Sequence, residues 1–206
     1  MNKTTMKRLL GSFAAVGAAA AMAGLGTFAT FTSSTSASHT ISSGTVSIAL
    51  GSTGASTNRL TVGASNVVPG DTIQRSVDLV NNGGSSADNL SGIVLTTPAS
   101  PSSLLDTEPT NGLQMVIEKC SVPWTEAGTA PAYTYTCSGT TSTVLTSRAV
   151  IGANLPLTGL ASLTTGATDH LRVTQTLPAA APNTMQGLTS TISYNFVGTQ
   201  RVAGNK

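Results

Sequence analysis

The stretch DTIQRSVDLV, residues 71–80, carries apolar side chains at alternating positions. Ile73, Val77 and Leu79 fall on one face of an extended chain, because successive side chains of a β-strand point to opposite faces of the sheet. Such alternation is typical of a strand with one face on a core and the other in water. The stretch therefore predicts an antiparallel sheet that packs on one side.

Three further stretches alternate in the same way, GLQMVIEKC at 112–120, DHLRVTQTLP at 169–178 and STISYNFVG at 190–198. Turn-forming Gly, Pro and Asn residues separate them. We therefore expect an all-β fold, an antiparallel jelly roll or β-sandwich of about eight or nine short strands. Weaker strand candidates are TVSIAL, NRLTV, SGIVLTT, AYTYTC and STVLT, and the one helix-like stretch is NLPLTGLASL at 154–163.

The charge of the chain is low and unevenly placed. Charged residues make up 9% of the 206 positions, with a formal net charge of +2 and a pI near 8.7. Three of the ten basic residues, Lys3, Lys7 and Arg8, precede every other charged residue. Without them, seven basic residues face eight acidic ones, a net charge of about −1. No basic stripe remains to neutralise phosphates, which argues against a nucleic-acid partner.

The N-terminus has the features of an export signal. A basic start, residues 1–8, precedes an uncharged and largely apolar run that extends to Phe31. This order is typical of a secretory signal peptide, although the run is long enough for a retained membrane anchor. We expect a cleaved signal at residues 1–30, cut between Thr30 and Phe31, with a cut after Ser38 as the alternative. The chain would then contact the membrane only through its signal peptide, before cleavage.

Cys120 and Cys137 are the only cysteines. In an exported protein an even pair predicts a disulfide. A zinc site is a poor alternative, because no histidine cluster accompanies the pair.

The segment at 31–43, between the signal and the expected domain at 44–206, permits two interpretations. The plain one is a flexible mature N-terminus. The other is a strand that adds to an exposed sheet edge of another copy, because the segment and its continuation are uncharged and prone to β-structure. The candidate donor residues are Phe31, Ile41, Val46 and Ile48.

Three stretches of the chain resemble the camelysin/TasA family of secreted proteins. GLGTFATFTSSTSASHTISSGTVSIAL is similar to the family's signal junction and first strand, VVPGDTIQRSVDLVNNGG to its Pro-Gly-Asp turn and next strand, and NTMQGLTSTISYNFVGTQR to its C-terminal pattern. They occur in the family's order, and 98–165 matches no motif. The matching positions are Gly44, Thr45, Pro69, Gly70, Asp71, Asn82, Gly83, Gln186, Gly187, Phe196, Thr199 and Gln200.

The resemblance implies a jelly-roll domain, secreted by a bacterium to the medium or cell surface and processed by a dedicated signal peptidase. It implies cleavage between Thr30 and Phe31. It also implies matrix fibres in biofilms, in which each N-terminal segment completes the sheet of the next copy. Association of this kind is head to tail and yields an open filament. The expected partners are other copies of the same chain.

The family also includes proteins classed as metallopeptidases. A zinc peptidase needs about three protein ligands and a general base, commonly in H-E-x-x-H on a helix. The chain has two histidines, His39 and His170, and neither lies in that motif. Asp169 beside His170 is a weak candidate pair. We therefore expect no catalytic residue, no metal and no cofactor. A monomeric binding or adhesion module, and a camelysin-like metallopeptidase, remain the alternatives to a fibre subunit.

Overall fold

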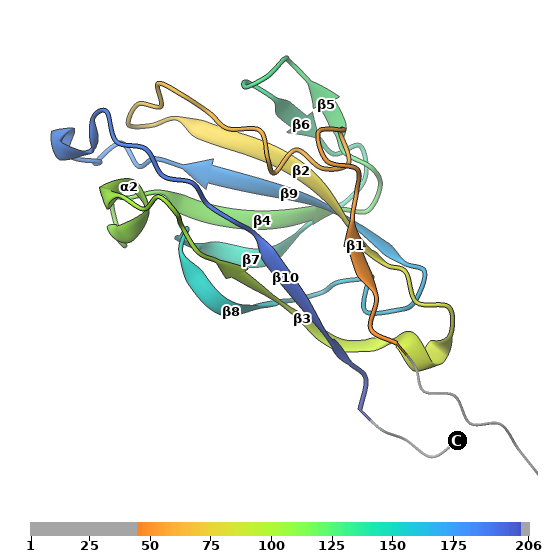
Figure 1. Ribbon diagram of the computed structural model, residues 1–206. Helices are drawn as coiled ribbons and strands as arrows, with labels where there is room; N and C mark the ends of the chain where they lie inside the picture. The colour runs from red at the N-terminus through yellow and green to blue at the C-terminus, as the bar shows by residue number, and fades with distance from the viewer. Residues whose placement is uncertain (1–44, 203–206) are drawn as a thin grey trace, which may run out of the picture. The chain divides into compact units, whose positions relative to one another are not determined.

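The structure, a computed structural model, describes residues 45–202 (Figure 1). Two antiparallel sheets pack face to face, and a small hairpin lies beside the larger one. The larger sheet has the strand order β1-β2-β9-β4-β7, so strands distant in sequence lie side by side. Its strands are β1 (Ile48–Leu50), β2 (Thr72–Asn81), β9 (Thr168–Thr176), β4 (Gln114–Cys120) and β7 (Thr141–Ala149).

The smaller sheet has the order β10-β3-β8, and the hairpin joins β5 to β6. All pairings are antiparallel. This architecture confirms the predicted all-β sandwich. The remaining strands are β3 (Leu90–Thr97), β5 (Thr125–Ala127), β6 (Thr134–Thr136), β8 (Gly152–Leu157) and β10 (Asn195–Gln200).

The core lies between the two sheets, where both supply one face of alternating side chains. β2 contributes Val77 and Leu79, as the sequence predicted, and β3 contributes Leu95 from the opposite sheet. The fully or almost fully buried aliphatic side chains are Val77, Leu79, Ile93, Leu95, Met115, Ile117, Val144, Val150, Leu171 and Val173.

Three stretches differ from their predicted structure. The helix-like stretch at 154–163 supplies four of the six residues of strand β8 instead, with Pro156 on an edge strand where its missing N–H costs no ladder bond. NRLTV forms only an isolated bridge from Asn58 to Val77. In STISYNFVG the regular strand begins at Asn195, although alternate residues from Ile192 onward are half-buried as expected.

The helical segments are short. Helix α2 (Leu104–Thr107) and the 3-10 turn η1 (Ser86–Asp88) each begin with a capping box, and η2 (Asn183–Met185) precedes the last strand. In α2 the Ser103 hydroxyl accepts from the Leu105 N–H, while the Asp106 carboxylate accepts from the Ser103 N–H at 2.8 Å. The pattern S-x-x-D marks such a start in sequence.

The expected signal at 1–30, the segment at 31–43 and the cleavage position at Thr30 and Phe31 lie outside the described residues. Within 45–202, no helix has the length and apolar character needed to span a membrane.

Candidate functional site

Strands β1 and β10 are edge strands of the two sheets and lie on the same side of the sandwich (Figure 1). Residues of these two strands line a cleft. In the described part of the chain each of these strands is paired on one side only. Leu50 of β1 and Tyr194, just before β10, line both hollows that make up this cleft. Leu79 and Phe196 form part of the apolar floor. The cleft therefore exposes, between two edge strands, partly buried side chains that pack against the core, namely Leu50, Tyr194 and Phe196.

The larger hollow of the cleft has a volume of about 1000 Å³. Its walls come from two irregular segments, 60–67 between β1 and β2 and 187–195 before β10. These segments replace regular strands, so the sandwich is incompletely closed here. Ile73, Leu105 and Met185 add apolar surface.

Arg75 is the one charged side chain among the described residues that line the cleft. It lies on the core side of β2, in alternation with Val77 and Leu79, and is only 4% exposed. Its guanidinium donates to the carbonyls of Val62 at 2.6 Å, Gln74 at 2.6 Å and Gly63 at 3.0 Å. Burial lowers the pKa of the Arg75 guanidinium.

Tyr194 adds a second polar group. The Gln175 side-chain amide donates to the Tyr194 hydroxyl at 2.7 Å, and both residues line the cleft with Arg75. Burial raises the pKa of Tyr194, so the phenol keeps its proton at neutral pH. The hydroxyl therefore retains its own O–H as a donor.

The start and the end of the described chain are both fixed at η1. The Asp88 carboxylate accepts from the Thr45 N–H at 2.5 Å, and from the N–H groups of Gly84 and Ser85 at 2.9 Å each. These bonds, that from Thr45 first, lower the pKa of Asp88. The Gln200 amide donates to the Ala87 carbonyl at 3.2 Å. In Figure 1 this turn lies at the opposite end of the sandwich from α2 and η2.

Several family-motif positions meet at this turn. Thr45 and Gln200 make the bonds just given, and the Asn82 N–H donates to the Ser47 carbonyl at 2.9 Å. A Cβ at Gly83 would lie 2.4 Å from the Asp88 Cβ, so only glycine fits. Gly44 lies outside the described residues.

The other motif positions form turns and strand pairs. The Asp71 carboxylate accepts from the Val68 N–H at 2.9 Å and closes the turn Pro69–Asp71, where Gly70 has φ +100°. Gln186 and Gly187 form the turn after η2. In β10, Phe196 lies opposite Leu95 and lines the cleft, and Thr199 lies opposite Gly92.

Of the candidate donor residues, Ile48 belongs to β1 and lies opposite Asn81 of the same chain. Val46 precedes β1 and is 47% exposed. Because Ile48 is bonded within its own sheet, a donor segment must end before β1. Phe31 and Ile41 lie outside the described residues.

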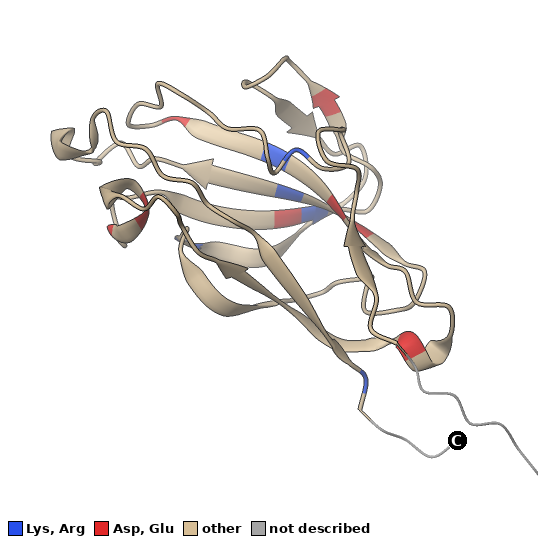
Figure 2. Ribbon diagram, in the orientation of Figure 1, with Lys and Arg blue, Asp and Glu red and all other residues tan. Residues whose placement is uncertain are grey.

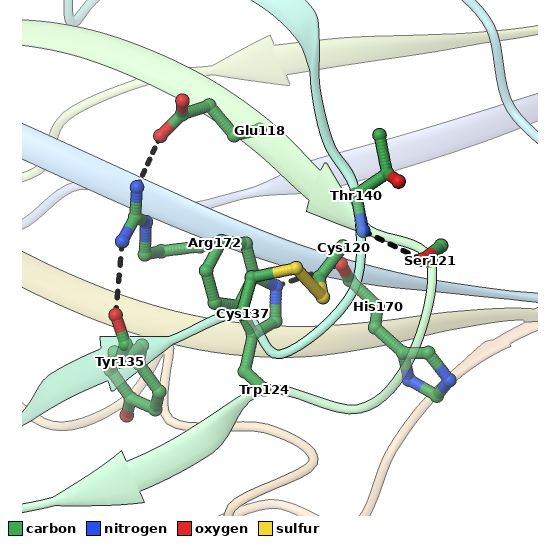
Figure 3. The surroundings of a disulfide bond; sticks show 9 residues. All are labelled: Glu118, Cys120, Ser121, Trp124, Tyr135, Cys137, Thr140, His170 and Arg172. Carbon is green, nitrogen blue, oxygen red and sulfur yellow. Dashed lines mark hydrogen bonds and ion pairs between the residues drawn. A yellow bond between two sulfur atoms is a disulfide. The ribbon is translucent and has the colours of Figure 1, made fainter.

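The two cysteines close a loop that carries the hairpin (Figure 3). Cys120, at the end of β4, is bonded to Cys137, just after β6, with 5.7 Å between their Cα atoms. Trp124 donates from its indole N–H to the His170 carbonyl at 2.8 Å, and the Arg172 guanidinium lies 4.4 Å from its ring centre. The bridge thus fastens the hairpin where Trp124 packs on β9.

Charged side chains avoid the smaller sheet. In Figure 2, strands β10, β3 and β8 carry none, whereas β2, β9 and β4 carry six of the eight Lys, Arg, Asp and Glu residues that lie on described strands. The outer side of the larger sheet is the polar face of the sandwich.

The described residues do not fit a catalytic metal site. A zinc peptidase needs about three protein ligands, and residues 45–202 contain no group of three His, Cys, Asp or Glu side chains placed to share an ion. His170 Nδ1 lies 2.7 Å from Asp78 Oδ1, while the carboxylate of Asp169 accepts from the N–H groups of Ala161 and Ser162. Asp169 and His170 therefore have separate partners. His39 lies outside the described residues.

Residues 5–107, half of the chain, match the model of the camelysin metallo-endopeptidase family. The chain belongs to this family. The match includes β1, β2 and β3 and ends in α2, so it does not reach the disulfide-bonded hairpin of this camelysin-family chain. No curated protein matches the chain.

The sequence interpretation missed Arg75 and Asp88. The signal for Arg75 was present, because its position continues the apolar face of Ile73, Val77 and Leu79. For Asp88 the sequence shows only the capping pattern Ser85-x-x-Asp88, which does not reveal the bond to Thr45, because that bond joins residues 43 positions apart.

Proposed function

We propose that this camelysin-family chain is a secreted structural protein, a subunit of a matrix or surface fibre. Copies assemble head to tail, and the N-terminal segment 31–43 of one copy enters the cleft of the next. The observation that carries this proposal is the cleft itself, which exposes partly buried apolar side chains, packed against the core, between the edge strands β1 and β10. An extended chain placed there finds unpaired backbone groups and an apolar floor.

The composition of the segment supports the same role. Residues 31–43 contain no Asp, Glu, Lys or Arg, so the cleft can take them up without desolvating a charged side chain. Ile41 and Phe31 supply apolar groups for the floor.

The location of Thr45 supports head-to-tail order. The described chain begins at Thr45, which is bonded to η1 at one end of the sandwich, whereas the segments 60–67 and 187–195 that line the cleft extend toward the other end (Figure 1). A copy that offers its segment at one end and its cleft at the other repeats without closing on itself.

Deletion of residues 31–40 tests the proposal. The purified chain is expected to form fibres visible by electron microscopy, and the deletion variant is expected to form none, because it lacks the donor segment. Circular dichroism and thermal unfolding of both proteins serve as the control for folding. Fibres of unchanged yield from a folded deletion variant would refute strand donation.

The family name makes peptidase activity the second candidate. The same preparations are therefore incubated with casein, with and without a chelator. We expect no cleavage that depends on metal. If the parent chain cleaves casein, and both the chelator and the substitution His170→Ala abolish that cleavage, peptidase activity would be favoured.

A further inference from the structure

Among the charged residues of the larger sheet, Arg75 and Arg148 have no carboxylate partner within 45–202, and Arg75 is the buried one of the two. Four ion pairs join described residues, Arg59 with Glu126, Lys119 with Asp169, His170 with Asp78 and Arg172 with Glu118, and Arg75 takes part in none of them.

Arg59 provides the closest comparison within the chain. Both guanidiniums lie over the ring of Tyr133, Arg59 at 4.5 Å and Arg75 at 5.8 Å from its centre. Arg59 is neutralised by Glu126 at 2.6 Å, and it does not line the cleft. Arg75 lines the cleft, and only backbone carbonyls accept its hydrogen bonds within 45–202.

A buried charge with no counterion is costly, and carbonyl dipoles offset only part of that cost. A guanidinium has five N–H groups, and three hydrogen bonds from Arg75 are present among the described residues. The remaining donors favour an occupant of the cleft that brings an oxygen acceptor. A cationic side chain placed nearby would meet the like charge of a guanidinium that is only 4% exposed and therefore weakly screened by water.

We propose that Arg75 sets the charge specificity of the cleft. The cleft accepts an extended peptide segment that presents uncharged or acidic side chains near Arg75, and it excludes segments with a basic side chain there. The natural occupant, the segment 31–43 of another copy, rests on the proposed function. This segment contains no Lys or Arg, as the charge specificity requires.

The test uses labelled peptides with the sequence of residues 31–44 and fluorescence anisotropy on the purified chain, at a concentration where it is monomeric. Each Ser or Thr of the peptide is replaced in turn by Glu and by Lys. At the positions that lie near Arg75, the Lys peptide is expected to bind at least about tenfold more weakly than the Glu peptide. The reason is that the guanidinium of Arg75 repels the Lys ammonium and attracts the Glu carboxylate at short range.

Arg75→Gln is expected to reduce this Glu-to-Lys ratio to near one, whereas Arg59→Gln, the matched control, should leave it unchanged. Arg75→Lys keeps the charge and should keep the ratio, even if the segment near Val62 loosens. A purely structural role for Arg75 would weaken all peptides equally and leave the ratio intact.

Equal binding of the Glu and Lys peptides at every position would overturn the charge specificity alone. Failure of every peptide to bind the parent chain would overturn strand donation and this inference with it. A ratio that persists in a folded Arg75→Gln variant would assign the discrimination to another group.

Discussion

The backbone N–H of Thr45 donates to Oδ1 of Asp88 at 2.5 Å, across 43 residues of sequence. The bond fixes the first described residue of the chain to η1. Through the bond from Gln200 to Ala87, the last strand is fixed to the same turn. A single buried carboxylate therefore helps to set where the N-terminal segment leaves the sandwich.

Asp88→Asn should lower the thermal stability of the domain. An amide has one acceptor oxygen, so its NH₂ group would face N–H donors that the carboxylate now binds. Differential scanning calorimetry should show a lower Tm. Asp71→Asn, at an exposed turn where a carboxylate oxygen accepts from Val68, is the matched control and should change Tm less. An Asp88→Asn variant as stable as the parent would contradict a stabilising role for the hydrogen bonds to the Asp88 carboxylate.

The same carboxylate predicts a pH dependence. The pKa of Asp88 in the folded chain is lowered, chiefly by the bond from Thr45. Its contribution to stability is therefore fully present above about pH 4, the ordinary Asp value, and is lost as the pH falls through the lowered folded pKa. Denaturant unfolding between pH 7 and pH 2 should show a steeper loss of stability for the parent than for Asp88→Asn. If the stability of the two proteins fell in parallel with pH, protonation of Asp88 would not be linked to unfolding.

Loss of the disulfide should destabilise the domain. A loop closed by cysteines 17 residues apart contributes about 3 kcal/mol in the chain-entropy description. The double variant Cys120→Ser, Cys137→Ser should unfold at lower denaturant concentration, and the parent should respond likewise to a reductant. A thiol assay on the denatured, non-reduced protein is expected to find no free thiol. Two titratable thiols would show that the bridge is absent.

A core truncation gives the scale for these effects. Leu95→Ala removes a fully buried side chain between the sheets and should cost about 2–5 kcal/mol in the free energy of unfolding. Val197→Ala, on the next strand and 54% exposed, should cost less than about 0.5 kcal/mol. Similar losses at the two positions would contradict the assigned core.

Assembly should respond to charge in the cleft but not on the outer face. Leu188 lines the cleft and is 39% exposed, so Leu188→Arg should fold while placing a cation that a docked segment must desolvate. Val197→Arg adds the same group on β10, where the Val197 side chain does not line the cleft. Electron microscopy should show few fibres for the first variant and normal fibres for the second. Equal fibre yields would argue against the cleft as the docking site.

Sequence patterns predicted the sandwich because its longest strands alternate over many residues. The face of Ile73, Val77 and Leu79 is the buried face observed. The three-residue strands were harder to predict from the sequence, because β5 and β6 depend on the disulfide and on packing between distant segments. The region 154–163 was misread because Leu spacing interrupted by Pro156 fits a helix as well as an edge strand.

The candidate site was less predictable than the fold. A cleft exists where strands fail to pair, and pairing partners such as β1 with β2 are set by contacts distant in sequence. Arg75 is the exception, because a cation within an alternating apolar face is visible in the sequence itself.

The attachment of both Thr45 and Gln200 to η1 also has a practical consequence for labelling. In the proposed fibre, a fluorescent protein joined to the C-terminal side of β10 would lie beside the point from which the donor segment extends, and would sterically hinder contact between neighbouring copies. The turn at 128–131, between the two strands of the disulfide-bonded hairpin, is exposed and lies away from η1 (Figure 1). In the proposed fibre, a small epitope inserted there is expected to report on the filament without blocking the end from which the donor segment extends.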